Sequence, residues 1–228
     1  MAVFHWYPIH DQAVTLAVDL PISPETFQQI NRLQKRATQQ LSTLLDDIVP
    51  SYNSLTLCFK REHKWSDYIK KIDQLLVSLA NDTVNEFENE SPIKKIPVCY
   101  EEYFAPDLFE ISCQLNLSKE KIIELHSKRT YQVYAMGFVP GFPYMGEINE
   151  QLILPRKAVP SQRIKAGSVA IANKQTGIYP FEVPGGWHVI GQTPLTLFNK
   201  NRTPLCLLQP GDQVQFYPIS KSEFESWP

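Results

Sequence analysis

A compact set of neutral hydrogen-bonding side chains lies in the second half of the chain. Gln175 and Thr176 supply an amide and a hydroxyl beside Gly177, and the phenol of Tyr179 follows two residues later. These groups both donate and accept hydrogen bonds, which suits the recognition of an amide, a lactam or a urea. The alternative is that residues 175–177 are a hairpin turn whose side chains face water.

A cation and an aromatic side chain could complete a pocket for a small polar ligand. The guanidinium of Arg163 could bind a carboxylate through its planar fork of N–H donors, or it could be a solvated surface group. Trp187 follows Gly185 and Gly186, so its indole could form a wall of the pocket, or it could belong to a barrel core. We expect Arg163, Gln175, Thr176, Tyr179 and Trp187 to bind the substrate.

One histidine is a candidate for acid–base catalysis. His126 lies at the end of a predicted helix, where the helix dipole favours the protonated ring, so it could transfer a proton near neutral pH. A purely structural histidine is the alternative. The nearby acidic residues, Glu147, Glu150 and Glu182, have no spacing that requires a carboxylate pair.

Glycine and proline divide the chain into two unlike halves. All nine glycines lie between Gly137 and Gly211, so the second half is rich in turns and the first is not. The positions expected to shape the loops around the site are Gly137, Pro140, Gly141, Gly185 and Gly186.

Several classes of protein are disfavoured by what the sequence lacks. It contains no phosphate-binding loop, no dinucleotide fingerprint, no zinc-protease motif and no serine-hydrolase motif, and its five histidines lack metal-ligand spacing. We therefore expect no metal. A net charge of −2 without a basic run argues against nucleic acid as a partner. The absence of a long apolar run and of a leader-like N-terminus predicts a cytoplasmic protein without a membrane span.

The first half reads as an α+β domain with a ferredoxin-like layout. Alternating or apolar stretches predict strands at 3–7, 13–18, 55–59 and 93–99. Apolar residues at helical spacing predict one helix that begins after Ser23 and continues to Pro50, and another over 65–79. The acidic stretch 81–91 cannot form a core, so we place the boundary there and assign residues 1–88 to this domain.

The second half, residues 89–228, reads as a mainly antiparallel β-barrel. Short helices are expected after Pro106 and after Ser118, followed by a strand at 130–136. Further short apolar stretches at 168–172, 187–190, 195–198 and 213–217 alternate with glycine or proline turns, which is typical of an antiparallel barrel or sandwich.

The order of these motifs resembles one protein family. The matching stretches are YQVYAMGFVPGFPY at 131–144, PRK at 155–157, RIKAGSV at 163–169, QTGIYP at 175–180, PGGW at 184–187 and QPGD at 209–212. They resemble the family of the 5-oxoprolinase B subunit (PxpB), also called allophanate hydrolase subunit 1, which includes the sporulation kinase inhibitor KipI. At 101–108 the chain lacks three glycines that the family usually carries, which puts the geometry of a partner surface in question.

The resemblance implies a fold, a reaction and partners. The fold is an α+β domain followed by a cyclophilin-like β-barrel. The protein works with a C-type subunit (of the allophanate hydrolase subunit 2 type) and an A-type subunit to open 5-oxo-L-proline to L-glutamate at the expense of ATP. ATP would be bound by the complex rather than by this chain alone. Gln175, Thr176 and Tyr179 would then bond the ring amide, Arg163 the carboxylate, and His126 would move a proton.

Two other functions stay open from the sequence. One is a KipI-type inhibitor that binds a sensor histidine kinase. The other is a carboxyltransferase-type subunit that acts on urea or a similar amide, which would need a separate biotin carrier because the chain has no Met-Lys-Met carrier sequence.

Overall fold

The computed structural model describes residues 4–62, 65–80 and 92–228. The chain divides into two compact units, Met1–Glu90 and Ser91–Pro228, called unit 1 and unit 2 below. The boundary predicted between residues 88 and 89 lies outside the described residues.

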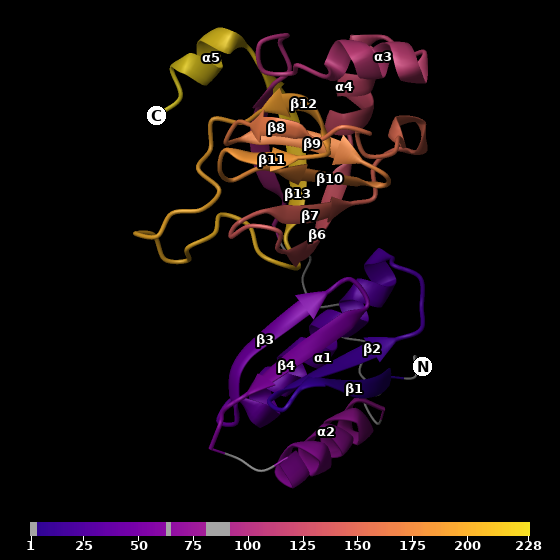
Figure 1. Cartoon of the computed structure of the whole chain (residues 1–228), viewed down its shortest axis with the longest axis vertical. Helices are drawn as coiled ribbons and strands as arrows, with labels where there is room; N and C mark the ends of the chain where they lie inside the picture. The colour runs from indigo at the N-terminus through magenta and orange to yellow at the C-terminus, as the bar shows by residue number, and fades with distance from the viewer. Residues whose placement is uncertain (1–3, 63–64, 81–91) are drawn as a thin grey trace. The chain divides into compact units, whose positions relative to one another are not determined.

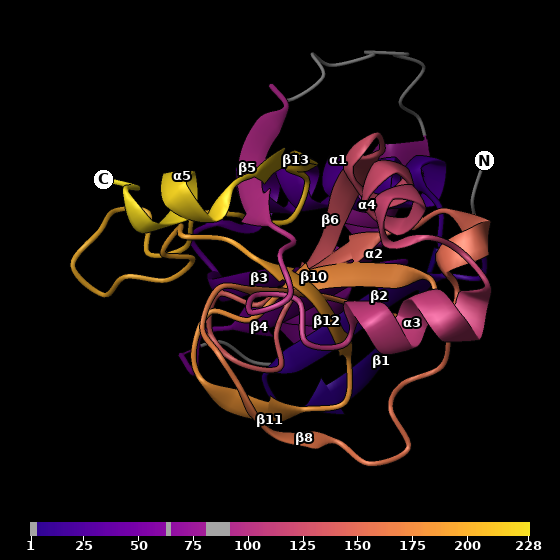
Figure 2. The ribbon, with the colours of Figure 1, turned by 90° about the horizontal axis from the view of Figure 1, so that it is seen from above.

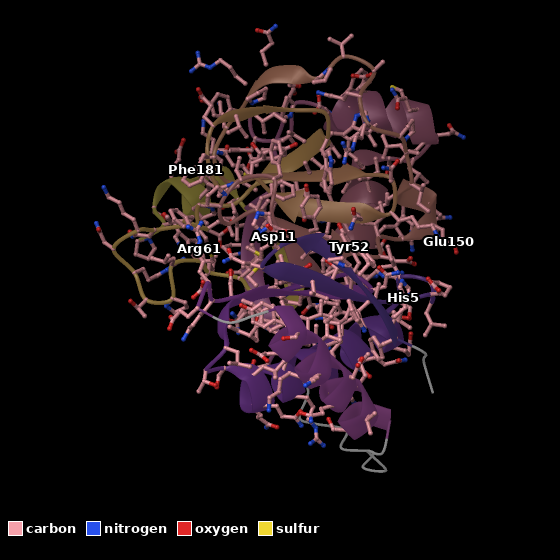
Figure 3. The ribbon with its side chains drawn as sticks, turned by 60° about the horizontal axis from the view of Figure 1, so that its bottom comes forward. His5, Asp11, Tyr52, Arg61, Glu150 and Phe181 are labelled. Atoms are coloured by element: carbon pink, nitrogen blue, oxygen red, sulfur yellow. The ribbon has the colours of Figure 1, made fainter. Side chains whose placement is uncertain are left out.

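Unit 1 is a four-stranded antiparallel sheet with two helices (Figure 1). Its elements are β1 (Phe4–His10), β2 (Ala13–Val18), α1 (Pro24–Leu41), β3 (Leu45–Ser51), β4 (Ser54–Phe59) and α2 (Trp65–Ala80). The strand order is β1-β2-β4-β3, so the sheet consists of two hairpins laid side by side. Asp11 and Tyr52, labelled in Figure 3, lie in the turns of these hairpins.

Local sequence explains how α1 begins and which face it buries. The Ser23 hydroxyl accepts a hydrogen bond from the Thr26 amide, and Pro24 occupies the first turn, where its missing N–H costs nothing. The apolar stripe of the helix, which includes Phe27 and Ile30, is fully buried. Tyr68 of α2 stacks on Phe59 of β4 with ring centroids 4.1 Å apart, so this helix also packs on the sheet.

Three expectations for the first half need correction. The first helix ends at Leu41, and residues 45–51 form β3, an edge strand that tolerates Pro50 because one side of such a strand needs no ladder partner. The strand expected at 93–99 is present as β5 (Lys94–Cys99), but it belongs to unit 2, where it pairs with β13. The ferredoxin-like layout is therefore not confirmed.

Unit 2 contains a closed seven-stranded barrel, in agreement with the predicted barrel domain. Its order is β10-β7-β6-β13-β5-β12-β9, and the β5–β13 pair is parallel whereas the other pairs are antiparallel. The strands besides β5 are β6 (Thr130–Met136), β7 (Pro143–Gly146), β9 (Ser168–Ala172), β10 (Gln175–Ile178), β12 (His188–Gln192) and β13 (Gln213–Ile219). The stretch 195–198, expected as a strand, forms only an isolated bridge between Phe198 and Cys206.

The remaining elements of unit 2 surround the barrel. They are α3 (Leu108–Leu115), α4 (Lys119–Ser127), the 3-10 helix η1 (Glu150–Leu152), α5 (Lys221–Glu225), and the strands β8 (Ser161–Ile164) and β11 (Val183–Gly185). The last two pair with each other in a separate two-stranded sheet, seen side by side in Figure 2. Within the described residues, every helix is too short or too polar to cross a membrane.

Candidate functional site

A cavity of about 260 Å³ opens in unit 2 beside β8, β9 and β12. Its polar lining consists of three cations, one carboxylate and four neutral groups: Lys157, Arg163, Lys165, Asp107, Tyr103, Ser161, Ser168 and Gln192. The excess of cations predicts that the cavity favours an anionic ligand.

An ion pair lies at the centre of this lining. Lys157 Nζ donates to Asp107 Oδ1 at 2.6 Å and to Ser161 Oγ at 3.0 Å. The side chains of the lysine and the aspartate are only 17% and 11% exposed. The ammonium is therefore largely withdrawn from solvent and held by two oxygens.

The position of Asp107 is fixed by β12. Its backbone N–H donates to Val189 O at 3.1 Å, and its Oδ2 accepts from Val189 N at 2.6 Å. The residue also begins α3, since Ile111 N donates to its carbonyl. Three backbone contacts thus orient the carboxylate that holds Lys157.

The segment that carries Lys157 is held by two further contacts. The Lys157 backbone N–H donates to Gly186 O at 2.8 Å, next to the end of β11. The carbonyl of Pro155 accepts from His188 Nε2 at 2.9 Å, which requires a proton on Nε2 of this buried histidine. The lysine consequently projects from a backbone that is tied to the barrel.

Two cations lie at the exposed rim of the cavity. Arg163, predicted to bind a carboxylate, lines the cavity but is 77% exposed and donates to Glu182 Oε1 through Nε at 2.9 Å and Nη2 at 2.6 Å. Lys165 Nζ lies 4.0 Å from the ring centroid of Tyr103, a cation–π geometry. Both side chains can approach a ligand from the solvent side.

His126 and Thr176 lie elsewhere, in the closed interior of the barrel. Both are fully buried, and His126 Nε2 lies 2.9 Å from Thr176 Oγ1 while Nδ1 lies 2.9 Å from Tyr100 Oη. Because Thr176 Oγ1 donates its proton to Ala170 O, it accepts from His126 Nε2–H, and Nδ1 in turn accepts from the tyrosine hydroxyl. This directed chain fixes the neutral Nε2–H tautomer.

Burial lowers the pKa of His126 to about 3, opposite to the direction expected from the helix terminus. The desolvation of the charged ring in the barrel interior outweighs the helix dipole. His126 is neutral near pH 7 and does not line the cavity. Its role as a proton shuttle stays a prediction that this geometry does not favour.

Tyr179 and Trp187 belong to a hydrophobic cluster next to the cavity. Both are almost fully buried and pack with Phe142. Burial raises the pKa of Tyr179 to about 12, against the opposing effect of a hydrogen bond from the Trp187 backbone. Gln175 begins β10 and is half-buried. The structure thus brings Arg163 to the cavity and leaves the other four predicted substrate-binding side chains outside its lining.

The predicted loop-shaping residues differ in how tightly they are held. Gly141 has φ +87°, and a Cβ there would lie 2.8 Å from Phe198 Cβ. A Cβ on Gly185 would lie 2.4 Å from Tyr179 Oη. In contrast, Gly137 and Gly186 have no neighbour closer than 3.9 Å to such an atom, and Pro140 lies exposed between β6 and β7.

The central pair of the cavity is not among the site residues predicted from the sequence. Asp107 and Lys157 are 50 residues apart, and the sequence shows Asp107 only as part of a helix start. The signal available is that both fall within stretches compared with the family, PDL at 106–108 and PRK at 155–157. Among the described residues, no group of three or more His, Cys, Asp or Glu side chains could hold a metal ion.

Comparisons with known proteins connect this architecture with named relatives. Residues 4–208 match the family described as carboxyltransferase domain, subdomain C and D. The chain is 37% identical over 188 residues to the B subunit of 5-oxoprolinase from Bacillus subtilis, covering 79% of this chain and 78% of the relative. It is 36% identical over 213 residues to the B subunit of 5-oxoprolinase from Escherichia coli O157:H7, covering 93% and 94%.

A solved structure shares the fold of this chain. The crystal structure of TTHA0988 superposes with a TM-score of 0.77 at 32% identity over 96% of this chain. This chain spans 40% of the length of that solved chain. On these matches, the chain belongs to the carboxyltransferase subdomain C and D family and, within it, to the family of the 5-oxoprolinase B subunit.

Proposed function

We propose that this chain is a non-autonomous subunit of an ATP-dependent 5-oxoprolinase that opens 5-oxo-L-proline to L-glutamate. The observation that carries the proposal is the nearly end-to-end similarity to the B subunit of 5-oxoprolinase from Escherichia coli O157:H7, 36% identical over 93% of this chain and 94% of the relative. The name of that relative as a subunit supports partner subunits, here an A-type and a C-type protein.

The cavity of unit 2 is chemically suited to this substrate. 5-Oxoproline is a five-membered lactam with one carboxylate, and the lining offers cations for the carboxylate and neutral groups for the lactam amide. A volume of about 260 Å³ is below the roughly 300–1,000 Å³ typical of drug-sized ligands and fits a small molecule.

In this proposal the lactam is bound by residues of the lining other than those predicted from the sequence. Gln192 uses its amide nitrogen to donate to Ala166 O at 2.7 Å, so its amide oxygen can accept the lactam N–H. The hydroxyls of Ser161 and Ser168 can donate to the lactam carbonyl. Arg163 keeps its predicted role at the carboxylate, reached from the rim.

The same lining supports dependence on other subunits. The described residues that form it include neither a histidine nor a cysteine, and their carboxylate, Asp107, is already bonded to Lys157 and to the Val189 amide. Proton transfer to and from the lactam would then fall to a group from a partner or to the lysines and Tyr103 of the lining. The sequence also has no phosphate-binding loop, so ATP would be bound by the assembled complex.

A second candidate is a carboxyltransferase-type reaction on urea or a related amide, favoured by the description of the matched family. The two are separated by co-purifying the chain with A-type and C-type subunits and measuring ATP hydrolysis in the presence of either 5-oxoproline or urea. Hydrolysis that depends on 5-oxoproline supports the proposal. Hydrolysis that depends only on urea with a biotin carrier supports the second candidate.

A further inference from the structure

We propose that Lys157 is the anchor for the carboxylate of a ligand in the cavity of unit 2, and that the chain binds small organic carboxylates there by itself. The inference deepens the proposed function and rests on it only for the identity of the carboxylate, L-5-oxoproline. The anion site is argued from the contacts of Lys157 and its surroundings.

The first argument is the number of donors on the lysine. An ammonium has three N–H groups, and in this structure Asp107 Oδ1 and Ser161 Oγ accept two of them. The third N–H points away from both oxygens, and the Lys157 side chain that carries it lines the cavity. A carboxylate oxygen of a bound ligand completes the set with a charge-assisted hydrogen bond.

The second argument is that the ammonium is held in place before any ligand arrives. Asp107 is locked by the Val189 amide and carbonyl, and the Lys157 backbone is tied to Gly186. A largely buried ion pair adds little net stability, because desolvation offsets the attraction between the charges. The pair does hold the ammonium in one orientation at the wall of the cavity, as a preorganised binding group requires.

The third argument is electrostatic. The carboxylate of Asp107 is engaged by Lys157 and by a backbone N–H, and the charge of Arg163 is offset by its ion pair with Glu182, so Lys165 supplies the additional positive charge at the rim. The surroundings of the third N–H are therefore cationic, and the low dielectric of a partly enclosed cavity strengthens the attraction for an anion. Inorganic phosphate shares the charge of a carboxylate but has no lactam edge for Gln192 and Ser168.

The test is isothermal titration calorimetry on the full chain with three probes: L-5-oxoproline, its neutral amide 5-oxoprolinamide, and inorganic phosphate. We expect L-5-oxoproline to bind and the neutral amide to bind about 10-fold or more weakly, since one charge-assisted hydrogen bond is lost. Equal binding of the acid and its amide contradicts the inference. Tighter binding of phosphate than of L-5-oxoproline shows an inorganic-anion site and overturns the carboxylate assignment.

Two variants that break the same ion pair separate a ligand anchor from a structural lysine. Lys157→Gln removes the cation, so affinity for L-5-oxoproline should fall about 10-fold or more. Asp107→Asn keeps the lysine and an oxygen for the Val189 amide but replaces the oxygen that holds the ammonium by an amide N–H donor, so only the orientation of Lys157 suffers and affinity should fall less than in Lys157→Gln. If both variants lose affinity equally while near-ultraviolet circular dichroism shows both folded, the pair is only structural.

Failure of this inference can be told apart from failure of the proposed function. If the isolated chain binds L-5-oxoproline through Lys157 but the assembled complex does not turn it over, the site stands and the function fails. If the complex turns over 5-oxoproline and Lys157→Gln changes neither KM nor kcat, the function stands and the anchor is wrong.

Discussion

Replacement of His126 by glutamine should make the stability of unit 2 much less dependent on pH. Burial lowers the pKa of His126 from 6.5 to about 3, so the folded protein keeps the ring neutral where the unfolded chain protonates it. The contribution of the neutral ring is complete above pH 6.5 and is lost progressively as the pH falls from 6.5 toward 3, at about 1.4 kcal/mol per pH unit.

The size of the effect follows from these two pKa values. At pH 5, proton binding by the His126 ring stabilises the unfolded chain by about 2 kcal/mol relative to pH 8. The folded protein, in which the ring stays neutral, gains almost nothing. At pH 8 His126→Gln is less stable than the wild type because it alters the hydrogen bonds to Tyr100 and Thr176. The difference in unfolding free energy between the wild type and His126→Gln should nevertheless shrink by about 2 kcal/mol from pH 8 to pH 5.

Urea unfolding followed by tryptophan fluorescence can measure this difference in unit 2. Changing Trp6 and Trp65 to phenylalanine leaves Trp187 and Trp227 as the reporters. Other titrating groups are common to both proteins and cancel in the comparison. His10→Gln, at an exposed histidine of unit 1, is the matched control and should follow the wild type. A gap between the wild type and His126→Gln that stays constant within about 0.5 kcal/mol over this range refutes the buried neutral histidine.

The remaining predictions concern packing, the buried hydrogen-bond chain and the rim. Gly185→Ala should destabilise unit 2 by about 1–3 kcal/mol, because its methyl group would meet Tyr179 Oη at 2.4 Å, whereas Gly186→Ala next to it should change the urea midpoint little. Equal midpoints would contradict the packing argument. Thr176→Val should cost about 1–3 kcal/mol by leaving a buried N–H without its acceptor, and Thr176→Ser should recover most of this in the same unfolding measurement. Arg163→Ala should raise KM for 5-oxoproline in the assembled complex while the unfolding free energy changes by no more than about 1 kcal/mol, since the side chain is 77% exposed; an unchanged KM would remove it from the site.

Strong local patterns predicted much of the fold from the sequence. The alternation in 130–136 and the apolar run 168–172 match β6 and β9 residue for residue, and the spacing in 65–79 predicts α2 to within one residue. The strand β3 was missed because Leu44 and Leu45 continue the helical spacing of α1 by chance. The sequence also does not say that β5 pairs with β13, since this parallel pairing joins residues about 120 positions apart.

The site was harder to predict than the fold, for a physical reason. Residue type shows that His126 and Thr176 can form hydrogen bonds, but only the closed barrel shows that they satisfy each other in its interior. Similarly, Lys157 in the sequence is one cation among many. Its significance comes from Asp107, which a turn before α3 brings to within 2.6 Å of its Nζ.

The most direct test of the proposed function is the release of L-glutamate from 5-oxo-L-proline by A-type and C-type subunits, with and without this chain. We predict glutamate release coupled to ATP hydrolysis when all three proteins are present, and none from this chain alone or from the other two without it. Equal glutamate release in its absence, or no release from a purified three-protein complex beside an active control complex, would contradict the assignment as a 5-oxoprolinase subunit.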